Sequence, residues 1–308
     1  MPAPLIHLAA TVAVSALMRG EPSRISGAID SLAASIGRRI AEVKGSTVGV
    51  AFRDLATGDT LFIGADESFH AASTMKVPVM IELFRRADAG GLSLDQGILL
   101  INQFRSIADG STYTLDATAD SDSLAYTLMN TRVPVRDLID HMITRSSNLA
   151  TNALIELVGA AHANETAHAL GAKNIRVLRG VEDTPAFRAG MNNTTTARDL
   201  ATLMEAIETG RAASRASCDA MRDILSRQEF NTEIPAGLPK GTKVAHKTGF
   251  ITGVLHDAAI VYPPGRSPYV LVVLTRDIPE QQVARRLISD ISRLVYTYVT
   301  STTGGSRS

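Results

Sequence analysis

The amino-acid sequence predicts an α/β fold joined to an all-α lobe: an antiparallel sheet is flanked by N- and C-terminal helices, and an all-helical lobe is inserted between its strands. Two observations lead to this prediction. Strand patterns occur near the two ends of the folded region, and helical patterns dominate residues 92–235 between them. The two ends must therefore meet in one sheet-containing lobe. A cleft between the two lobes is where a site is expected.

The prediction divides the chain of 308 residues, which is long enough to bury a substantial core, into four parts. These parts are a signal peptide at 1–22, a sheet lobe made of 23–85 together with 236–300, a helical lobe at 86–235 and a disordered tail at 301–308.

The signal peptide is predicted from the apolar run Leu5–Met18, which is too short to span a bilayer but has the length of a signal-peptide core. Val14-Ser15-Ala16 offers a small-residue cleavage site. No Lys or Arg precedes the run, which makes the signal weak. We expect a bacterial protein that is periplasmic or secreted, without stable membrane insertion.

The sheet lobe begins with a helix, because apolar residues recur at helical spacing across 25–43. Thr47–Phe52 and Thr60–Ile63 follow as two strands, and the turn between them, rich in Asp, Thr and Gly, predicts a hairpin. A long helix then begins near Ser73 and runs towards Ala89.

The helical lobe carries a loop at Arg105–Asp122, a segment rich in Ser, Thr, Asp and Gly. Its clearest predicted helices are Val135–Ile143, Leu149–Val158 and Ala197–Thr209. Strand patterns then return, and a helix closes the fold. The predicted elements are the strands Val244–Thr248, His256–Tyr262 and Tyr269–Thr275 and the helix Glu280–Val299.

Composition argues against several classes of function. The chain has 31 basic and 31 acidic residues, so it lacks the surplus of Lys and Arg that a nucleic-acid partner requires. Its single cysteine, Cys218, has no His or Cys cluster around it, and we expect a small buried side chain. The seven histidines show no metal-ligand spacing, so neither a metal nor another cofactor is predicted.

The first candidate motif is Ser73-Thr74-Met75-Lys76. In a helix that starts here, Ser73 and Lys76 share a face, and a helix N-terminus favours an oxyanion formed at the serine. A serine hydroxyl is a weak nucleophile unless a neighbour accepts its proton, and a lysine with a lowered pKa can do so. The alternative is a capping serine and a solvated lysine. The apolar run after Lys76 weakens that alternative.

Two further motifs lie far along the chain. Ser146-Ser147-Asn148 precedes a predicted helix, where Ser and Asn are also ordinary caps. Lys247-Thr248-Gly249 ends a predicted strand; the lysine and threonine suit an anionic group, and the glycine permits close approach to the backbone. For Lys247-Thr248-Gly249, the alternative is a plain strand-to-turn transition.

Taken together, these motifs resemble the SxxK, SDN and KTG signature of class A β-lactamases and penicillin-binding proteins. Their order, spacing and element types agree with the family, and the resemblance covers nearly the whole chain after the leader. It implies the β-lactamase/transpeptidase-like fold, and an enzyme that opens the β-lactam ring of penicillins and cephalosporins through an acyl-enzyme. Water then releases the product.

The resemblance also implies a role for each matching residue. Ser73 is the nucleophile, Lys76 helps to remove its proton, Ser146 relays a proton to the departing nitrogen, and Asn148 binds the side-chain amide of the substrate. Lys247 and Thr248 of the Lys247-Thr248-Gly249 motif hold the substrate carboxylate. Backbone N–H groups of Ser73 and Phe250 form the oxyanion hole.

Two positions depart from the family pattern. Ser147 replaces the aspartate of the middle motif, and we expect it to be tolerated. The family's deacylating glutamate follows an arginine after one intervening residue, whereas here Glu182 comes one place late after Arg179. Glu182 is the first choice of general base and Asp183 the second, with two acidic residues in a solvated turn as the alternative.

Three functions remain open at this stage. The first is β-lactam hydrolysis. The second is a D-alanyl-D-alanine carboxypeptidase or esterase of the same superfamily. The third is a penicillin-binding or sensor domain that stays acylated, which the lack of a later membrane-spanning run disfavours. The expected partner is a small-molecule β-lactam or D-Ala-D-Ala-like substrate, and the family implies a monomer. His256-Asp257 resembles a base pair for serine, but its place on a strand favours a structural role.

Overall fold

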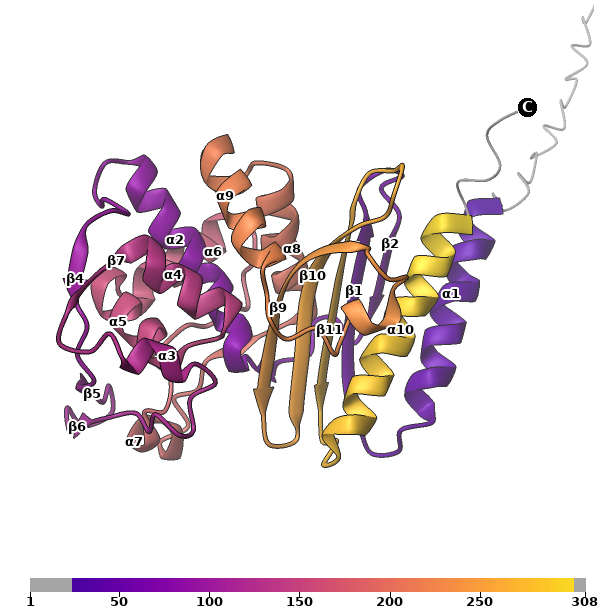
Figure 1. Ribbon diagram of the computed structural model, residues 1–308. Coiled ribbons are helices and arrows are strands. Elements are labelled where there is room, and N and C mark those ends of the chain that lie inside the picture. Colours follow the sequence, from indigo (N-terminus) through magenta and orange to yellow (C-terminus); the bar gives the residue numbers. More distant parts are fainter. Residues whose placement is uncertain (1–23, 302–308) are drawn as a thin grey trace, which may run out of the picture.

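The computed structural model describes residues 24–301 (Figure 1). The predicted signal peptide at 1–22 therefore lies outside the described residues, as does 302–308 of the predicted tail. Ser301 is the last residue of helix α10 (Gln281–Ser301), so that helix runs two residues beyond the predicted end at Val299. Within the described part, none of the helices is both long and apolar enough to cross a membrane.

A five-stranded antiparallel sheet forms the centre of the molecule, as the sequence predicts. Its strand order is β2-β1-β11-β10-β9, so the hairpin from the start of the fold pairs with strands from its end. The predicted strands are all present, and all but β2 extend one to three residues beyond the predicted limits. Their bounds are β1 Thr47–Asp54, β2 Thr60–Ile63, β9 Lys243–Ile251, β10 Val254–Tyr262 and β11 Tyr269–Arg276.

One face of this sheet is covered by the two terminal helices, α1 (Arg24–Ala41) and α10, which lie side by side (Figure 1). Alternation along each strand sends every second residue to this face. The side chains buried there include Ile36, Val50, Phe52, Leu271, Leu287 and Ile291. The other face carries Ala51, Val272 and Leu274, which join the core of the helical lobe.

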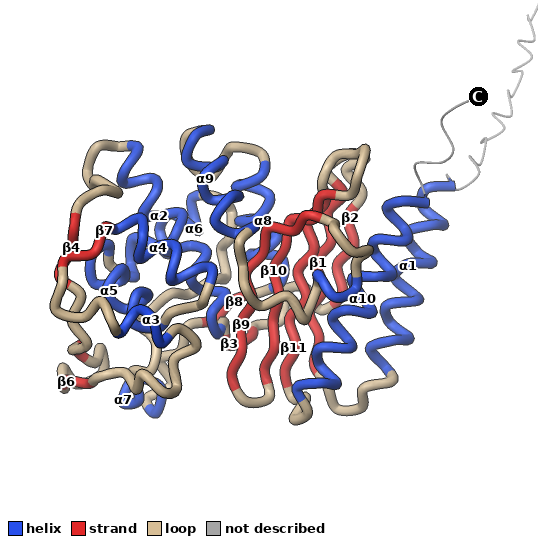
Figure 2. The backbone as a smooth tube through the Cα atoms, viewed as in Figure 1, coloured by secondary structure: helices blue, strands red, loops and turns tan. Residues whose placement is uncertain are grey.

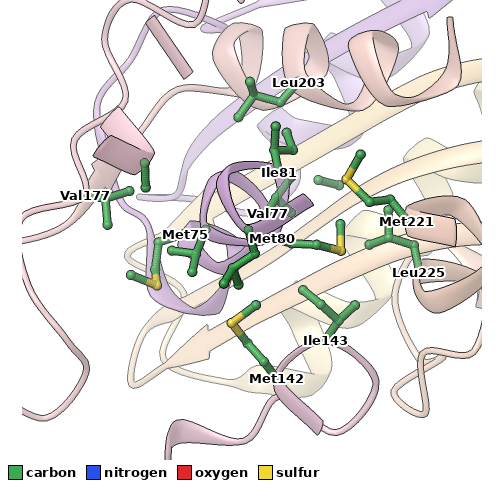
Figure 3. Close-up of a cluster of buried hydrophobic side chains, with 14 of the residues drawn as sticks. Met75, Val77, Met80, Ile81, Met142, Ile143, Val177, Leu203, Met221 and Leu225 are labelled. Atoms are coloured by element: carbon green, nitrogen blue, oxygen red, sulfur yellow. The ribbon is translucent and has the colours of Figure 1, made fainter. Parts of the chain in front are cut away.

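Helix α2 (Lys76–Asp88), which the prediction counted mostly with the sheet lobe at 23–85, runs through the middle of the helical lobe and shares its core (Figure 3). Its side chains from Lys76 to Phe84 are buried all round, which is typical of a central helix, and Met80 and Ile81 pack among methionines and leucines of its neighbours. The surrounding helices are α4 Val135–Thr144, α5 Asn148–Val158, α6 Ala160–Ala169, α8 Ala197–Glu208 and α9 Arg215–Ser226. Cys218 is fully buried in this core, as predicted.

The inserted lobe is not purely helical, and this corrects the all-helical expectation. It contains two short two-stranded ribbons, drawn as red segments among the blue helices in Figure 2. Strands of two or three residues leave no alternation to detect. The ribbons are β4 Gly97–Leu99 with β7 Arg132–Pro134, and β5 Phe104–Arg105 with β6 Thr112–Tyr113.

Several short elements border the space between sheet and helices. The pair β3 (Phe69–His70) and β8 (Thr194–Thr195) links the two lobes. A 3₁₀ turn at Ala72–Met75 precedes α2, so Ser73 stands in this turn and the α-helix itself begins at Lys76. The remaining short elements are helices α3 Ser123–Tyr126 and α7 Thr184–Arg188 and a 3₁₀ turn at Pro235–Gly237.

Candidate active site

Lys76, the first residue of α2, is fully buried and points at the start of α5. Its Nζ donates hydrogen bonds to the carbonyl oxygen of Ser146 at 2.6 Å, to Ser146 Oγ at 3.2 Å and to Asn148 Oδ1 at 3.0 Å. The first and second motifs are therefore in direct contact across about seventy residues of sequence.

Lys247 of β9, also fully buried, reaches the same serine from the sheet. Its Nζ donates to Ser146 Oγ at 3.0 Å and to the carbonyl oxygen of Thr248 at 2.9 Å. The hydroxyl of Ser146 thus lies between two lysine side chains, one from each lobe. This arrangement joins all three motifs through a single oxygen atom.

Burial disfavours the ammonium form of both lysines. It lowers the pKa of Lys76 to about 7, although the carboxylates of Asp120 and Glu182 act in the opposite direction. It holds the pKa of Lys247 well below the usual value, and the charge of Lys76 adds to this effect. A lysine with a pKa near neutrality can accept a proton as well as donate one.

Ser73 lies where two hollows of the surface meet. A cavity of about 600 Å³ and a smaller one of about 260 Å³ share four lining residues: Ser73, Ala119, Asn148 and Phe250. Gly249 lets β9 approach the turn that carries Ser73, because a Cβ atom at Gly249 would lie 3.1 Å from the backbone nitrogen of Ser73. A side chain at position 249 would require the turn or the strand to shift by a few tenths of an ångström.

Backbone strain gathers at this place. Among the described residues, five that are not glycine have a positive φ, and three of them are Ala72 (44°), Ser146 (59°) and Glu182 (60°). Such conformations cost about 1–3 kcal/mol each and persist only where the surroundings enforce them. All three border the cleft. The surrounding structure therefore holds these unfavourable backbone conformations where they direct groups towards the cleft.

The start of α5 explains how Ser147 is accommodated. Ser147 Oγ caps the helix by accepting from the backbone N–H of Ala150. The two N–H groups before it, those of Asn148 and Leu149, donate to the buried carboxylate of Asp120 at 2.9 and 3.1 Å. A carboxylate from another loop therefore neutralises this helix end.

Glu182 faces the same polar group from the 180–192 loop, the segment between Arg179 and Asn193. Its Oε1 accepts a hydrogen bond from Asn148 Nδ2 at 2.8 Å, while the Oδ1 of that amide accepts from Lys76. Burial raises the pKa of Glu182, and the nearby charge of Lys76 partly offsets the shift. The side chain lines the larger cavity together with Ser73.

Asp183 lines the same cavity but is bonded differently. Its carboxylate is buried and holds two backbone N–H groups, those of Ala186 in α7 and Ile107 in the adjacent ribbon loop, at 3.1 and 3.0 Å. It therefore caps α7 and ties this loop to its neighbour. These two hydrogen bonds explain why an aspartate occupies position 183 without any role in proton transfer.

Side chains hold the two ends of the 180–192 loop together. The guanidinium of Arg179 donates to the carbonyl oxygens of Gly180 and Met191 at 3.0 and 2.9 Å, and Asn193 bonds the backbone of Arg179. Asn152 of α5 then holds Val181: its Oδ1 accepts from Val181 N at 2.7 Å and its Nδ2 donates to Val181 O at 3.1 Å. The Asn152 contacts fix the two peptides that flank Val181, the residue just before Glu182.

The pair His256-Asp257 does not form a couple, because neighbours in a strand point to opposite faces. Asp257 accepts instead from the buried ring of His246 at 2.9 Å and from the backbone of Ile234 at 3.0 Å. His256 Nε2 donates to the carbonyl oxygen of His70 at 2.9 Å. Both histidines and the aspartate are buried, in agreement with the structural role predicted for His256-Asp257.

The sequence reasoning missed several residues of the site. Asn152 had a usable signal, since it follows Asn148 by one helical turn and so shares its face. Asp120, and the contact between Glu233 and Arg285 (3.4 Å) on the wall of the smaller cavity, come from segments that no motif marks. Within residues 24–301, no group of three or more His, Cys, Asp or Glu side chains is arranged to hold a metal ion.

An antiparallel sheet with an inserted helical lobe and a polar cleft between them is the architecture of β-lactamases and penicillin-binding proteins, to which solved structures of this fold belong. The family described as "Beta-lactamase enzyme family" matches residues 31–299. The chain belongs to this family of enzymes.

Individual relatives agree with this assignment. The β-lactamase of Streptomyces albus G is 28% identical over 298 residues, which cover 93% of this chain and 92% of the relative. The β-lactamase of Sphaerobacter thermophilus DSM 20745 is 30% identical, with a TM-score of 0.76 over 88% of this chain and 98% of that one. PBP-A is 32% identical, with a TM-score of 0.76 over 88% of this chain and 96% of PBP-A. A mutant of PBP-A is known as an acyl-enzyme complex with penicillin G.

Proposed function

We propose that this enzyme hydrolyses β-lactams through an acyl-enzyme formed on Ser73. The observation that carries the proposal is the contact of Ser146 Oγ with both Lys76 and Lys247, on the wall of the smaller of the two cavities that Ser73 lines. A nucleophile, a proton acceptor and a proton relay are thereby available within one cleft.

In the acylation step, Ser73 Oγ attacks the lactam carbonyl carbon and its proton passes to the free amine of Lys76. The pKa of about 7 leaves a useful fraction of Lys76 unprotonated at neutral pH. The C–N bond then breaks, and Ser146 passes a proton from the lysine side to the departing nitrogen. The backbone N–H groups of Ser73 and Phe250 stabilise the oxyanion in this proposal.

The substrate carboxylate is assigned to Lys247 and Thr248. Burial and the nearby Lys76 weaken the proton affinity of Lys247 in the free enzyme. An arriving carboxylate restores it, because an opposite charge at short range favours the ammonium form. Binding of the anion and protonation of Lys247 are therefore coupled. Asn148, whose amide already bridges Lys76 and Glu182, offers its free capacity to the substrate amide.

For deacylation we assign Glu182 as the general base that removes a proton from the attacking water. It faces the cavity beside Ser73 and contacts Asn148, and its raised pKa makes it a better proton acceptor than an ordinary glutamate. Asp183, the second choice from sequence, is fully engaged by backbone N–H groups.

The test is to mix the purified protein with a chromogenic cephalosporin and to follow both turnover and the mass of the intact protein. Sustained turnover with no lasting adduct supports the proposal, and Ser73→Ala must abolish both turnover and adduct. No reaction, or equal turnover by Ser73→Ala, contradicts the proposal.

A second candidate is a penicillin-binding D-alanyl-D-alanine carboxypeptidase or a related esterase. Two observations favour it: the likeness to PBP-A, and the position of Glu182 one place later than in the β-lactamase pattern. In the same experiment, one stoichiometric burst followed by a persistent adduct supports this candidate. Release of D-alanine from a D-alanyl-D-alanine peptide then identifies the peptidase.

We further propose that the protein acts outside the cytoplasm of a bacterial cell as a monomer, and that it contributes to resistance against β-lactam antibiotics. The apolar run Leu5–Met18 supports export. Cell fractionation with a measurement of the mature N-terminus tests the export. Sedimentation tests the monomer, and the minimum inhibitory concentration of a susceptible host tests resistance.

A further inference from the structure

The smaller cavity beside Ser73 has an acidic side chain on its wall. Among the described residues that line it, Glu233 alone is acidic, and the other polar groups there include Thr248 and Arg285. Together with the buried Lys247, these two residues suit the carboxylate of a substrate. A carboxylate of the protein itself repels that anion, so anion binding does not explain the presence of Glu233.

Glu233 is almost fully buried, and its two carboxyl oxygens differ in their contacts. The residue is only 3% exposed. Its Oε1 accepts from Thr232 Oγ1 at 2.8 Å and from Arg285 Nε at 3.4 Å, a long contact. Its Oε2 is buried and has no hydrogen-bond partner among residues 24–301. The negative charge of this carboxylate is therefore only partly balanced, and a positive charge brought to the cavity stabilises it.

The charged neighbours of Glu233 leave this imbalance in place. The side chain of Arg285 is 29% exposed, and its printed contact is with Oε1 alone. Burial disfavours the ammonium form of Lys247. Asp257 is engaged by His246 and by the backbone, and its like charge adds to the effect of burial in raising the pKa of Glu233. A positive charge in the cavity acts in the opposite direction and favours the ionised carboxylate.

We infer that Glu233 is a specificity-determining residue, and that it favours substrates with a positive charge beside the carboxylate held by Lys247 and Thr248. The inference rests on the proposed function and adds the class of substrate. The substrate carboxylate lies on the side of the departing nitrogen. A cationic group on the neighbouring ring carbon then enters the same cavity, where the charge of Glu233 attracts it across a short, poorly hydrated distance.

Cephalothin and cephaloridine test this charge preference, because they share one acyl group and one carboxylate. They differ at the ring carbon next to the one that bears the carboxylate, where cephalothin has a neutral acetoxymethyl group and cephaloridine a pyridiniomethyl group. The second-order rate constant for acylation of the purified protein is measured for each compound by rapid quench and intact mass. Comparison of the ratio of cephaloridine to cephalothin between variants cancels the intrinsic reactivity of the two compounds.

Two substitutions should shift this ratio in opposite directions. Glu233→Gln keeps the shape of the side chain and the oxygen that Thr232 and Arg285 bind, but it removes the charge. We expect the ratio to fall about tenfold. Arg285→Gln removes a positive charge beside the same carboxylate, so the ratio should rise, by a smaller factor because Arg285 is partly exposed.

Glu229→Gln is the matched control. Glu229 belongs to the same segment of the chain, but its side chain is 52% exposed, pairs with Arg145 and lies on neither cavity wall. The same loss of charge at this position should leave the ratio unchanged. Circular dichroism and thermal unfolding verify that each variant is folded.

The outcomes separate the inference from the function beneath it. An unchanged ratio in folded Glu233→Gln overturns the inference alone, whether both rate constants stay the same or both rise because Glu233 repels the shared carboxylate. An equal fall of the ratio in Glu229→Gln also overturns it, because the preference would then not depend on the cavity wall. Failure of both compounds to acylate Ser73 in the unsubstituted protein overturns the proposed function together with it.

Discussion

Asn152 binds both polar groups of the Val181 backbone, accepting from its N–H at 2.7 Å and donating to its carbonyl oxygen at 3.1 Å. Glu182 is the next residue and has a φ of 60°, a conformation that a glutamate seldom adopts unaided. The two hydrogen bonds hold the peptide from which the Glu182 side chain turns into the cleft. Asn152 is therefore a positioning residue for the proposed base.

Replacing Asn152 with alanine should slow deacylation about 100-fold while acylation changes little, because a displacement of about 1 Å at a reacting group has an effect of this size. Asn164 is a matched control: its amide binds Val177 in the same two-bond manner, at 2.7 Å each. Both alanine variants should lose about 1–3 kcal/mol of stability. Single-turnover kinetics of the two steps check this, and equal deacylation in both variants would contradict the positioning role.

Glu182→Gln should acylate normally and then keep the adduct, with deacylation reduced about 100-fold or more, because the amide cannot accept the proton of water. Asp183→Asn serves as the comparison. It should deacylate at nearly the original rate but unfold at a lower temperature, since Asp183 holds two backbone N–H groups. Intact mass after mixing with substrate measures the adduct. If Glu182→Gln released the adduct normally while Asp183→Asn trapped it, Asp183 rather than Glu182 would be the general base.

Gly180→Ala should disturb the same loop by collision. A Cβ atom at this glycine would lie 2.5 Å from Oδ1 of Asn152, well inside the contact distance, so the hold on Val181 must shift. We expect slower deacylation and a lower melting temperature. Gly37→Ala in α1, where a Cβ atom meets nothing within 4 Å, should leave deacylation unchanged and should not lower the melting temperature, because alanine favours a helix more than glycine does. Should Gly180→Ala behave like Gly37→Ala, the loop is not held as tightly as its contacts indicate.

The acylation rate should rise with pH and reach half its maximum near pH 7, because only the unprotonated amine of Lys76 accepts a proton and its pKa is about 7. The deacylation rate should fall as the pH is lowered. The midpoint of this fall should lie above 4.5, the ordinary pKa of glutamate, because the pKa of Glu182 is raised. Single-turnover acylation followed from pH 5 to 9 provides the measurement. In Lys76→Arg, whose side chain stays protonated, the rise should disappear; a rise that persists would assign the titration to another group.

Sequence patterns predicted the large elements well because their periodicity extends over many residues. The strands of the central sheet and the terminal helices were found within a few positions. The antiparallel arrangement followed from the order of the elements and the short turns. The ribbons β4–β7 and β5–β6 were missed, because two or three residues carry no detectable alternation.

The candidate site was predicted where its chemistry lies in short motifs at the ends of elements, as at Ser73 and Lys247. The contacts that hold these motifs in place could not be predicted in the same way. Asp120 neutralises the start of α5 from a loop that reads only as polar. The left-handed backbone of Glu182 depends on contacts from α5, and no residue type at position 182 announces it. Such features arise from tertiary contacts, which single-sequence patterns do not record.

The inner face of the sheet and the inserted helices share one hydrophobic core, in which Val272 and Leu274 pack with Leu200 and Met204. Interiors of this density do not open without exposing apolar surface to water. Separating the sheet from the helices around Ser73 would expose this shared apolar surface, so we expect the distance between them to change little when a ligand binds. On this expectation, discrimination between substrates depends on shape and charge already in place at first encounter.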